Sequence, residues 1–586
     1  MANTFISNEV EFSGRTGDEL ALQNPKYYKE WPIVYAIYND DEIYIGETVN
    51  AKVRMSQHYE NQERRKLKKV RIISGEKFNK SVILDLEAFL IQHISADTKF
   101  KKMQNGNSGH QRHDYYEREE YEAEFDNIWK RFCDKDIGLA VKSRNDIENS
   151  NLFKYSPYKT LTDDQFIVSN HIIADLVKCI KEGKNSTYIV NGGPGTGKTV
   201  LAIFLMKLLA TEIQKDTNLE DENLVEMLSV IHTLLPNFKM GIVVSMSNLR
   251  ATLWDVFGST YGLSKNMVYT PSQIANSNEI FDLLIVDEAH RLKAPRNMMG
   301  VEIHNIRENN KKLGMDEHRG TQLDWIIKKS KHQIFFYDKM QSIKRTDIDA
   351  GVFDKLIKSG AKSLDLNTQV RCGKGGERYI NYIRKIFSNN PPEEFIDFEK
   401  NGLDYDFKIF DDVREMTDLI IAKNEEEEVG LCRNIAGYGW PWKTKDKIHP
   451  SNKQETDECI RRGLYDIDID GNRYIWNTQY VNFIASKNSV NEIGCIHTIQ
   501  GFDLNYAGVI IGNELRYNEK TDELYIDKKS YHDAFGKQQT SDEDLRQYIF
   551  NIYSVLCTRG INGTYIYACD EGLRKYLKKF IKTFNK

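Results

Sequence analysis

The sequence is poor in cysteine and lacks the spacings that metal or disulfide frameworks need. Its eight cysteines are scattered over 586 residues, and no Cys-x-x-Cys pair occurs among them. A zinc knuckle requires closely spaced pairs, and a disulfide framework requires a denser set. The sequence therefore supports neither kind of framework.

Long apolar stretches and a strongly basic composition are also missing. No segment is long and apolar enough to span a bilayer, and the N-terminus does not show the basic and then apolar layout of a signal peptide. We therefore expect a soluble, cytoplasmic protein. The formal net charge of -5 means that any nucleic-acid surface would have to be a local patch.

A glycine-rich segment has the full pattern of a phosphate-binding loop, Gly-x-x-x-x-Gly-Lys-Thr. It comprises Gly192, Gly193, Pro194, Gly195, Thr196, Gly197, Lys198 and Thr199. An apolar run typical of a strand precedes it, and an apolar helical run follows it. Glycine lets backbone N–H groups approach phosphate oxygens, and the start of a helix adds a positive dipole end. The pattern predicts that Lys198 reaches the β and γ phosphates of ATP and that Thr199 binds Mg²⁺.

An acidic pair follows a second apolar run. Residues 281–286 are almost continuously apolar, which is typical of a buried parallel strand, and Asp287 and Glu288 come directly after them. Such a pair alone also fits a helix cap. Behind a phosphate-binding loop, we expect Asp287 to hold Mg²⁺ and Glu288 to polarise the attacking water.

Further strands and short motifs follow in a definite order. Other runs typical of strands lie at residues 240–247, where the strand leads into a polar turn, and at residues 333–337, 508–512 and 563–567. Gln165 lies in a capping-type helix start before the glycine-rich loop, with its amide free to read an adenine edge. Gln341 follows a strand, Arg371 ends the motif Asn-Thr-Gln-Val-Arg, and Arg559 stands in Cys-Thr-Arg-Gly.

This ordered set resembles a superfamily 1 helicase motor and is most similar to the Schlafen group 3-type helicase domain. The segment 433–442, Arg-Asn-Ile-Ala-Gly-Tyr-Gly-Trp-Pro-Trp, is also similar to that group. The resemblance covers about residues 155–575. It implies two RecA-like lobes, with ATP in the cleft between them and a nucleic-acid strand crossing both.

The same resemblance implies roles for single residues. Gln165 would contact adenine, Gln341 would sense the γ-phosphate, and Arg371 and Arg559 would stabilise the transition state from the second lobe. An arginine in that role is worth about 10³ to 10⁵ in rate. A surface salt bridge is the alternative for each arginine.

Two β-rich runs near the N-terminus, residues 32–38 and 42–46, flank a turn signal and predict a hairpin. A helical pattern over residues 49–59 follows and contains Arg54 and His58. These segments resemble the GIY-YIG nuclease family, in which Ile-Val-Tyr ending at Tyr35 stands for the first motif and Tyr-Ile-Gly beginning at Tyr44 for the second.

The nuclease resemblance covers about residues 30–110 and implies a catalytic site. Glu87, inside an apolar helical run, matches a single metal-binding glutamate, and Asn105 matches the closing asparagine. The implied catalytic residues are Tyr35, Tyr44, Arg54, His58, Glu87 and Asn105. Cleavage of a phosphodiester needs a proton acceptor, a Mg²⁺ ion on the charged oxygens and a fixed cation, and these residue types can provide them.

Some alternatives stay open in this region. The first motif lacks its glycine, so an inactive, DNA-binding relic is one alternative, and a generic hairpin with a helix is another. The basic cluster at residues 64–71 is either a solvated face or a track for a phosphate backbone. Residues 291–320 are polar, and we expect them to form a long loop.

We therefore predict an α/β protein. Its length and 40% hydrophobic content allow about three or four domains. A small α+β GIY-YIG-like nuclease domain would precede two RecA-like P-loop lobes with parallel sheets. The expected boundaries are an N-terminal arm at 1–30, the nuclease domain at 31–114, a helical connector at 115–154, the first lobe at 155–350 and the second lobe at 351–586.

The predicted function is an ATP-dependent helicase or translocase with a Mg²⁺-dependent endonuclease. Its partner would be nucleic acid, DNA rather than RNA, and its setting prokaryotic anti-phage defence or restriction, which is an analogy drawn from the pairing of the two domains. A nucleotide-gated nuclease that does not unwind is one alternative, and an RNA-directed enzyme is the other. A homo-oligomer or a partner from a defence system is left open.

Overall fold

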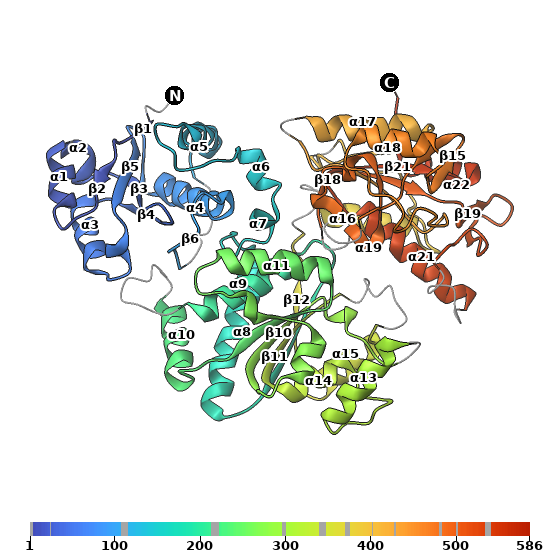
Figure 1. Cartoon of the computed structure of the whole chain (residues 1–586), viewed down its shortest axis with the longest axis horizontal. Helices are drawn as coiled ribbons and strands as arrows, with labels where there is room; N and C mark the ends of the chain where they lie inside the picture. Colours follow the sequence, from blue (N-terminus) through green and yellow to red (C-terminus); the bar gives the residue numbers. More distant parts are fainter. Residues whose placement is uncertain are drawn as a thin grey trace.

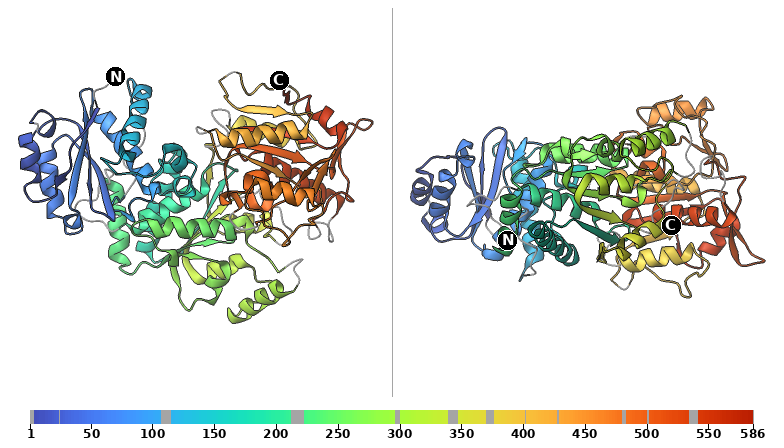
Figure 2. Two further views of the ribbon diagram at one scale, coloured as in Figure 1. Left: turned by 45° about the horizontal axis from the view of Figure 1, so that its top comes forward. Right: turned by 90° about the horizontal axis from the view of Figure 1, so that it is seen from below.

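The computed structural model of the chain contains three six-stranded sheets, one after another along the sequence (Figure 1). It describes residues 4–23, 25–106, 115–211, 222–295, 300–338, 347–369, 376–400, 402–426, 429–479, 483–499, 502–533 and 541–585. The first sheet and the third lie at opposite ends of the molecule in Figure 2, in blue and in orange to red. Helices cover both faces of each sheet, which confirms the predicted α/β class.

The first sheet has the order β1-β5-β3-β4-β6, and β2 pairs with β5. Its strands are β1 (Thr4–Ile6), β2 (Val10–Glu11), β3 (Ile33–Tyr38), β4 (Glu42–Thr48), β5 (Lys69–Gly75) and β6 (Lys102–Met103). The predicted hairpin is confirmed, because β3 and β4 pair antiparallel with Tyr35 opposite Gly46.

Alternation along β3 sends its side chains to two different cores. Val34 and Ala36 pack in a core with α4 (Lys80–Asp97) and α5 (Arg118–Cys133). Ile33, Tyr35 and Ile37 pack on the other face, with α1 (Thr16–Gln23) and α3 (Ala51–Glu60). Tyr35 therefore lies on the same side of the sheet as the helix that carries Arg54 and His58.

The second sheet is entirely parallel, in the order β12-β7-β11-β10-β8-β9. Its strands are β7 (Ser186–Gly192), β8 (Met240–Val244), β9 (Val268–Tyr269), β10 (Phe281–Asp287), β11 (Ser330–Tyr337) and β12 (Lys362–Leu366). The strand carboxyl ends share one edge, so the glycine-rich loop after β7 and the acidic pair after β10 meet there.

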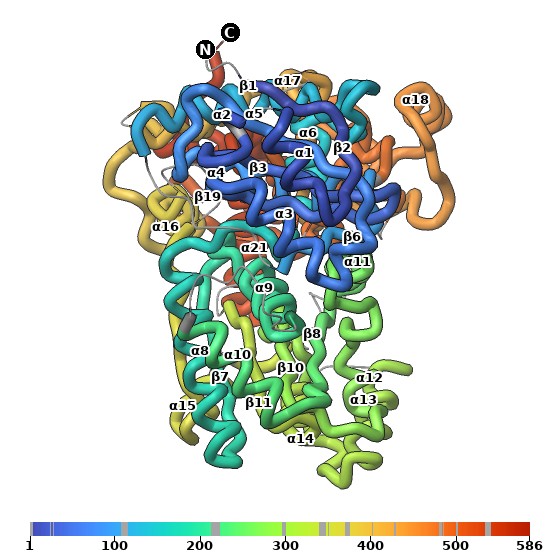
Figure 3. The backbone as a smooth tube through the Cα atoms, turned by 90° about the vertical axis from the view of Figure 1, so that its left-hand side faces the viewer, coloured from blue at the N-terminus to red at the C-terminus, as the bar shows by residue number. Residues whose placement is uncertain are grey.

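Helices from different parts of the chain cover the two faces of this sheet. One face packs against α8 (Asp163–Glu182), α9 (Lys198–Ala210), α10 (Glu222–Leu234) and α11 (Ser247–Ser259). The other face packs against α12 (Pro271–Asn276), α14 (Gln322–Lys329) and α15 (Ala350–Lys358). The end-on view of Figure 3 shows this lobe below the N-terminal domain.

The expected long loop over residues 291–320 is wrong for its central part. Residues Val301–Lys312 form α13, in which only Ile306, Asn309 and Asn310 are buried. Asn310 Oδ1 accepts a hydrogen bond of 2.5 Å from Trp325 Nε1 on α14. One apolar side chain and two buried amides hold this helix, and they leave no apolar stripe in the sequence.

The third sheet is also parallel, in the order β17-β14-β18-β21-β13-β22. Its strands are β13 (Asp406–Ile409), β14 (Arg433–Ala436), β17 (Ile493–Cys495), β18 (Leu504–Ile511), β21 (Gly560–Ala568) and β22 (Lys582–Thr583). One core contains α16 (Gly376–Ile386), α21 (Asp542–Cys557) and α22 (Glu571–Leu577). The opposite core contains α17 (Val413–Glu425).

Two of the predicted domain boundaries separate strands that pair with each other in the structure. Strands β1 and β2 lie in the predicted segment 1–30, and β12 lies in the predicted segment 351–586. Strands β1 and β2 pair with β5 of the first sheet, and β12 pairs with β7 of the second sheet. Between the first two sheets lie α5, α6 (Arg144–Glu148) and α7 (Asn151–Lys154). Within the described ranges, no helix combines the length and apolarity that crossing a bilayer would require.

Candidate functional site

The glycine-rich loop connects β7 to α9 and adopts a backbone that needs glycine. Gly195 and Gly197 have φ angles of 83° and 75°, in the left-handed region that side chains with a Cβ avoid. A Cβ on Gly192 would lie 2.5 Å from Thr196 Oγ1. The loop therefore wraps closely around the start of α9, as a phosphate cradle requires.

Lys198 occupies the centre of this loop. Its Nζ donates hydrogen bonds to the carbonyl oxygens of Gly192 and Gly193, over 2.7 and 2.9 Å. The carboxylate of Asp338, directly after β11, lies 3.6 Å from the same nitrogen. A buried ammonium at the mouth of a helix N-terminus makes this position suited to phosphate oxygens.

Thr199 and Asp287 are brought together from two motifs. Thr199 Oγ1 donates a hydrogen bond of 2.7 Å to Asp287 Oδ2. Asp287 is fully buried, and burial, followed by the charge of Glu288, raises the pKa of its carboxyl to about 7. A hydroxyl and a carboxylate beside a phosphate loop are ligands that Mg²⁺ prefers, so these two residues fit the ion.

Glu288 lies beside Asp287 in a strained backbone conformation. Its φ angle of 52° places it in the left-handed region, which non-glycine residues seldom occupy. Its Oε2 lies 2.9 Å from Nε2 of the fully buried His290. Burial raises the pKa of Glu288, but His290, Lys198 and Arg291 outweigh it, so the carboxyl pKa is lowered. The ionised form is the one that can polarise water.

Gln165 supports the loop with its whole side-chain amide. Its Nε2 donates to the carbonyl oxygen of Thr196 over 2.8 Å, and its Oε1 accepts from the backbone N–H of Thr162 over 3.0 Å. Gln369, which follows β12, donates to the carbonyl oxygen of Pro194 over 2.6 Å. The expected capping start of α8 is present, and its glutamine reaches the phosphate loop.

The expected residues of the second lobe are only partly described. Gln341 and Arg371 lie outside the described residues. Arg559 is buried, and its guanidinium donates to the carbonyl oxygens of Val555 and Phe502 over 3.2 and 3.4 Å. Sequence reasoning missed a different arginine: Arg384 Nη2 lies 3.6 Å from the position that a Cβ on Gly193 would take.

In the N-terminal domain, Tyr35 packs against the glycine of the second motif. A Cβ on Gly46 would overlap the hydroxyl and the ring of Tyr35. Tyr35 and Tyr44 are both buried, with ring centroids 6.3 Å apart. Glycine at position 46 is therefore what allows the two tyrosines to share one site.

A hydrogen-bond chain fixes the tautomer of His58. Arg64 Nη1 lies 2.6 Å from His58 Nδ1, and a guanidinium can only donate, so Nδ1 accepts. Burial, followed by the charges of Arg64 and Arg54, lowers the pKa of His58 well below its usual value. The neutral ring carries its proton on Nε2, which donates to Tyr35 Oη over 2.6 Å.

Tyr35 Oη thus accepts two hydrogen bonds, because Arg54 Nε also donates to it over 3.3 Å. Burial, followed by Tyr44, raises the pKa of Tyr35 well above its usual value, and Arg54 opposes this. The phenol is therefore neutral at rest. Two donors aimed at its oxygen reduce the free-energy cost of forming a phenolate there.

Arg64 is a second residue that sequence reasoning missed. Its guanidinium carbon lies 3.7 Å from the ring centroid of Tyr44, in addition to its bond with His58. Arg71 is also buried and donates to the carbonyl oxygens of Ser7 and Asp136 over 2.9 and 3.0 Å. The basic cluster at 64–71 is therefore not one surface, since two of its arginines point inward.

Glu87 lies on α4 and is buried. Its charge raises the pKa of Tyr35 and of Tyr44, so it belongs to the same electrostatic environment. Across the described residues, no group of three or more histidine, cysteine, aspartate or glutamate side chains is gathered as a metal cluster. One carboxylate, with water and phosphate oxygens as further ligands, is a donor set that fits Mg²⁺.

Asn105 holds the second motif in place. Its side-chain amide accepts from the N–H of Ile45 over 3.0 Å and donates to the carbonyl oxygen of Ile45 over 2.7 Å. The main-chain oxygen of Asn105 accepts a hydrogen bond of 3.2 Å from Tyr158 Oη. Tyr158 comes after α7, so this asparagine joins the strand β4 to the segment that leads into the second sheet.

Lys207, on the helix α9 that starts at the phosphate loop, lies close to Tyr158. Its Nζ donates to the carbonyl oxygen of Tyr261 over 2.7 Å and lies 5.8 Å from the ring centroid of Tyr158. Lys102, beside β6, lies with its Nζ 4.3 Å from the ring centroid of Tyr261. The N-terminal domain is therefore fastened to α9 and to the end of α11.

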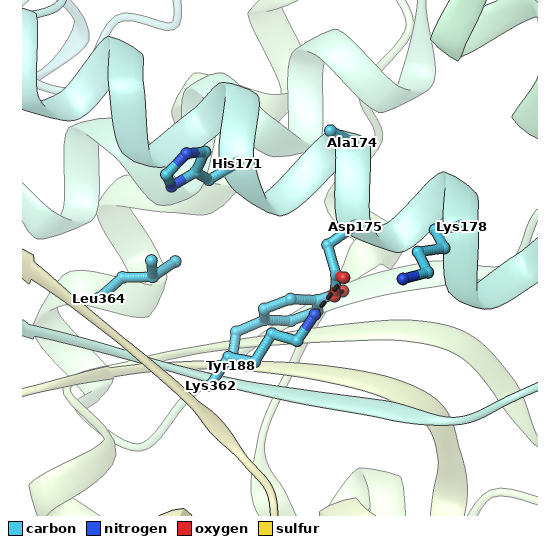
Figure 4. A pocket seen from close by; sticks show the side chains of 7 residues that line it. All are labelled: His171, Ala174, Asp175, Lys178, Tyr188, Lys362 and Leu364. Carbon is cyan, nitrogen blue, oxygen red and sulfur yellow. Dashed lines mark hydrogen bonds and ion pairs between the residues drawn. The ribbon is translucent and has the colours of Figure 1, made fainter.

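A separate cavity of about 390 Å³ lies between α8 and the strands β7 and β12 (Figure 4). It is lined by His171, Ala174, Asp175, Lys178, Tyr188, Lys362 and Leu364. Tyr188 Oη donates to Asp175 Oδ2 over 2.8 Å, and Lys362 pairs with the same carboxylate. Lys362 opens β12 whereas the phosphate loop follows the end of β7, so this cavity is not the nucleotide site.

Comparison with known proteins identifies the two domains in which these residues lie. The model of the Schlafen group 3, DNA/RNA helicase domain matches residues 185–570, and that of the GIY-YIG catalytic domain matches residues 32–102. The chain combines an NTP-hydrolysing helicase with a phosphodiester-cleaving nuclease. It belongs to the Schlafen group 3 DNA/RNA helicase domain family and carries a GIY-YIG catalytic domain at its N-terminal end.

Single relatives are more distant. Uncharacterized protein YPL245W of Saccharomyces cerevisiae is 26% identical over 423 residues, which are 67% of this chain and 83% of that protein. The Arterivirus nonstructural protein 10 helicase with DNA is 14% identical, with a TM-score of 0.24, over 69% of this chain and 65% of its own. A Pif1 helicase from Bacteroides with ADP-AlF3 and single-stranded DNA is 9% identical, with a TM-score of 0.25, over 70% of this chain and 92% of its own.

Proposed function

We propose that this chain is an ATP-driven motor on nucleic acid that carries a Mg²⁺-dependent endonuclease, and that DNA is its substrate in prokaryotic anti-phage defence or restriction. The observation that carries the proposal is the presence of two separate constellations in one chain. One is Lys198, Thr199 and Asp287 at the phosphate loop, and the other is the Tyr35 and His58 pair beside Glu87.

In the motor, the residues of the first lobe divide the work on ATP. Lys198 binds the β and γ phosphates, Thr199 and Asp287 hold Mg²⁺, and Glu288 polarises the attacking water. The ionised state of Glu288, with its pKa lowered beside His290, supports that role. The family resemblance assigns γ-phosphate contacts to Gln341, Arg371 and Arg559, and adenine contact to Gln165.

In the nuclease, Tyr35 first loses its phenol proton to solvent, and the resulting phenolate then accepts a proton from the attacking water. The N–H groups of His58 and Arg54 stabilise the charge on its oxygen. Glu87 holds Mg²⁺, which supplies Lewis-acid stabilisation of the phosphate oxygens when it is bound. Tyr44 stays neutral, because burial raises the pKa of its hydroxyl, and it orients Arg64 with its ring.

The DNA preference and the defence role rest on analogy. A restriction or defence activity needs a component that follows a nucleic acid and a component that cuts it, and this chain joins both kinds of domain. RNA is the alternative substrate, because the family is described as acting on DNA or RNA.

A second candidate function is a nucleotide-gated nuclease that does not unwind. The contact of Lys207 on α9 with Tyr158 and Tyr261 favours it, because α9 begins at the phosphate loop and ends against the N-terminal domain. Such a helix can report the state of the ATP site to the nuclease without strand separation.

One experiment tests these functions together. Purified protein is incubated with labelled duplex, forked and single-stranded DNA and with matching RNA, in Mg²⁺, with and without ATP. ATP-dependent strand separation with cleavage of DNA supports the proposal. ATP-dependent cleavage without separation supports the gated nuclease, and cleavage confined to RNA contradicts the DNA preference.

A further inference from the structure

The helix α16 of the third-sheet domain brings an arginine to the phosphate loop. Arg384 Nη2 lies 3.6 Å from the position that a Cβ on Gly193 would take, so a side chain added there would meet this guanidinium. α16 lies on the side of the second lobe that faces the first lobe in Figure 1. Arg384 therefore crosses the cleft between the two lobes.

Among the described residues, Arg384 has no polar partner that would account for this position. Arg384 is partly buried, and within the described ranges no hydrogen bond or ion pair engages its guanidinium. A guanidinium with five donors is costly to desolvate without an acceptor. An anion bound at the phosphate loop would be such an acceptor.

Two cations converge on the same glycine. Lys198 Nζ donates to the carbonyl oxygen of Gly193 over 2.9 Å, on the inner side of the loop. The carboxylate that lies near this lysine, that of Asp338, is 3.6 Å from its nitrogen. Asp287 and Glu288 are also charged neighbours of Lys198, whereas the β and γ phosphates that Lys198 is expected to bind would bring acceptors to Arg384 as well.

The helix that carries Arg384 is firmly anchored in its own lobe. Tyr379, Ile380, Ile383 and Ile386 pack in the core of the third-sheet domain. Tyr379 Oη donates to the carbonyl oxygen of Cys557 over 2.8 Å. Since Cys557 is two residues before Arg559, the two arginines are carried by elements that are bonded to each other.

We propose that Arg384 contacts the terminal phosphates of the bound nucleoside triphosphate from the second lobe, in addition to the arginines that the family resemblance implies. The proposal rests on the proposed ATPase function of the phosphate loop. Because Arg384 shares Gly193 with Lys198, it is placed at the end of the site that differs between ATP and ADP. Arg384 is therefore a residue that distinguishes the triphosphate from the diphosphate.

The test compares Arg384→Ala and Arg384→Lys with Arg378→Ala, which removes an exposed arginine from the same helix. Binding of fluorescent ATP and ADP analogues is measured at equilibrium, together with kcat and KM for ATP hydrolysis and the thermal midpoint with each nucleotide. We expect Arg384→Ala to weaken ATP binding about tenfold or more, as for the loss of a charge-assisted hydrogen bond, and to leave ADP binding within about twofold.

The conservative variant gives a second readout. Lysine keeps the charge without the planar fork, so Arg384→Lys should recover part of the ATP affinity. Arg378→Ala should behave as the wild type does. Unchanged ATP binding in Arg384→Ala, or equal losses for ATP and ADP, would overturn the proposal.

The outcome also separates this inference from the proposed function. A wild-type protein that hydrolyses ATP, with Lys198→Ala inactive and Arg384→Ala unaffected, would keep the ATPase and remove the role of Arg384. A wild-type protein that binds no nucleotide in the fluorescence and thermal measurements would overturn both.

Discussion

Thr199 at the start of α9 donates a hydrogen bond of 2.7 Å to Asp287 at the end of β10, across 88 positions of sequence. The parallel order β7-β11-β10 brings the two together, since it places the loop after β7 and the end of β10 at the same edge. The two residues that we propose as Mg²⁺ ligands are therefore already in contact with each other. Binding of the ion needs a change of partner for Thr199 but no movement of strands.

Lys198→Ala should abolish ATP hydrolysis and leave the fold intact. The substitution removes the ammonium that contacts the carbonyl oxygens of Gly192 and Gly193, and these face the phosphate site rather than an apolar core. The thermal midpoint should move by no more than about 2–4 °C, which corresponds to about 1 kcal/mol in a domain of about 200 residues. Hydrolysis near the wild-type rate in a colorimetric phosphate assay would contradict the role of the loop.

Nucleic acid should stimulate ATP hydrolysis, because a bound strand that closes the two lobes would bring second-lobe arginines to the γ-phosphate. Arg559→Ala and Arg371→Ala should then lower kcat more than they weaken ATP binding. Arg559 is buried and bonded to two carbonyl oxygens, so its variant should also lose stability. Arg559→Lys serves as the control for folding, and equal losses of binding and kcat would count against the role.

Glu87→Gln should stop strand cleavage while ATP hydrolysis persists. The substitution keeps the size of the side chain and removes the negative charge that is expected to hold Mg²⁺. It should also raise the Mg²⁺ concentration needed for any residual cleavage, which a metal titration measures. Wild-type cleavage by this variant would show that the N-terminal domain is a binding module.

Gly46→Ala should impair cleavage through Tyr35. A Cβ at position 46 would overlap the phenol, so the ring must move away from His58 and Arg54, at a cost of about 1–3 kcal/mol. Gly14→Ala is the matched control, because its Cβ would meet Tyr59 at 3.4 Å, an ordinary contact. Equal cleavage rates and equal unfolding free energies for the two variants would argue against this packing.

Tyr158→Phe should weaken the response of cleavage to ATP. The variant loses the hydrogen bond to the main-chain oxygen of Asn105 but keeps the ring beside Lys207, at a cost of about 1 kcal/mol in unfolding free energy. Cleavage is measured with and without ATP, and ATP hydrolysis serves as the control. An unchanged ratio of the two cleavage rates would show that this contact does not connect the sites.

The sequence predicts the parallel strands well and the polar helix poorly, for a physical reason. Strand β10 is buried on both faces, so its sequence is a continuous apolar run that can be recognised alone. Helix α13 depends on the contact of Asn310 with Trp325, residues 15 positions apart. Nothing in the local sequence of α13 records that contact.

The site residues also divide into those that a local motif predicts and those that depend on contacts between distant elements. The phosphate loop is a contiguous motif whose glycines are required by its own backbone, as at Gly195 and Gly197. Arg64 and Arg384 belong to no motif, since one is a member of a basic cluster and the other lies in an ordinary amphipathic helix. Their positions follow from how distant elements pack, which a single sequence does not contain.

The hydrogen bond between Tyr158 and Asn105 also affects how long a nuclease fragment has to be in order to fold without the motor. The core around α4 includes Trp129, Phe132, Ile147 and Tyr158, all of which follow the segment that matches the GIY-YIG domain. A fragment cut directly after that segment would leave an apolar face of α4 bare and would lack Asn105, whose side chain bonds to Ile45 of β4. A cut beyond Tyr158 keeps the covered face of α4 and the hydrogen bond between Asn105 and Tyr158. A nuclease fragment that folds by itself therefore has to extend to the start of the motor domain.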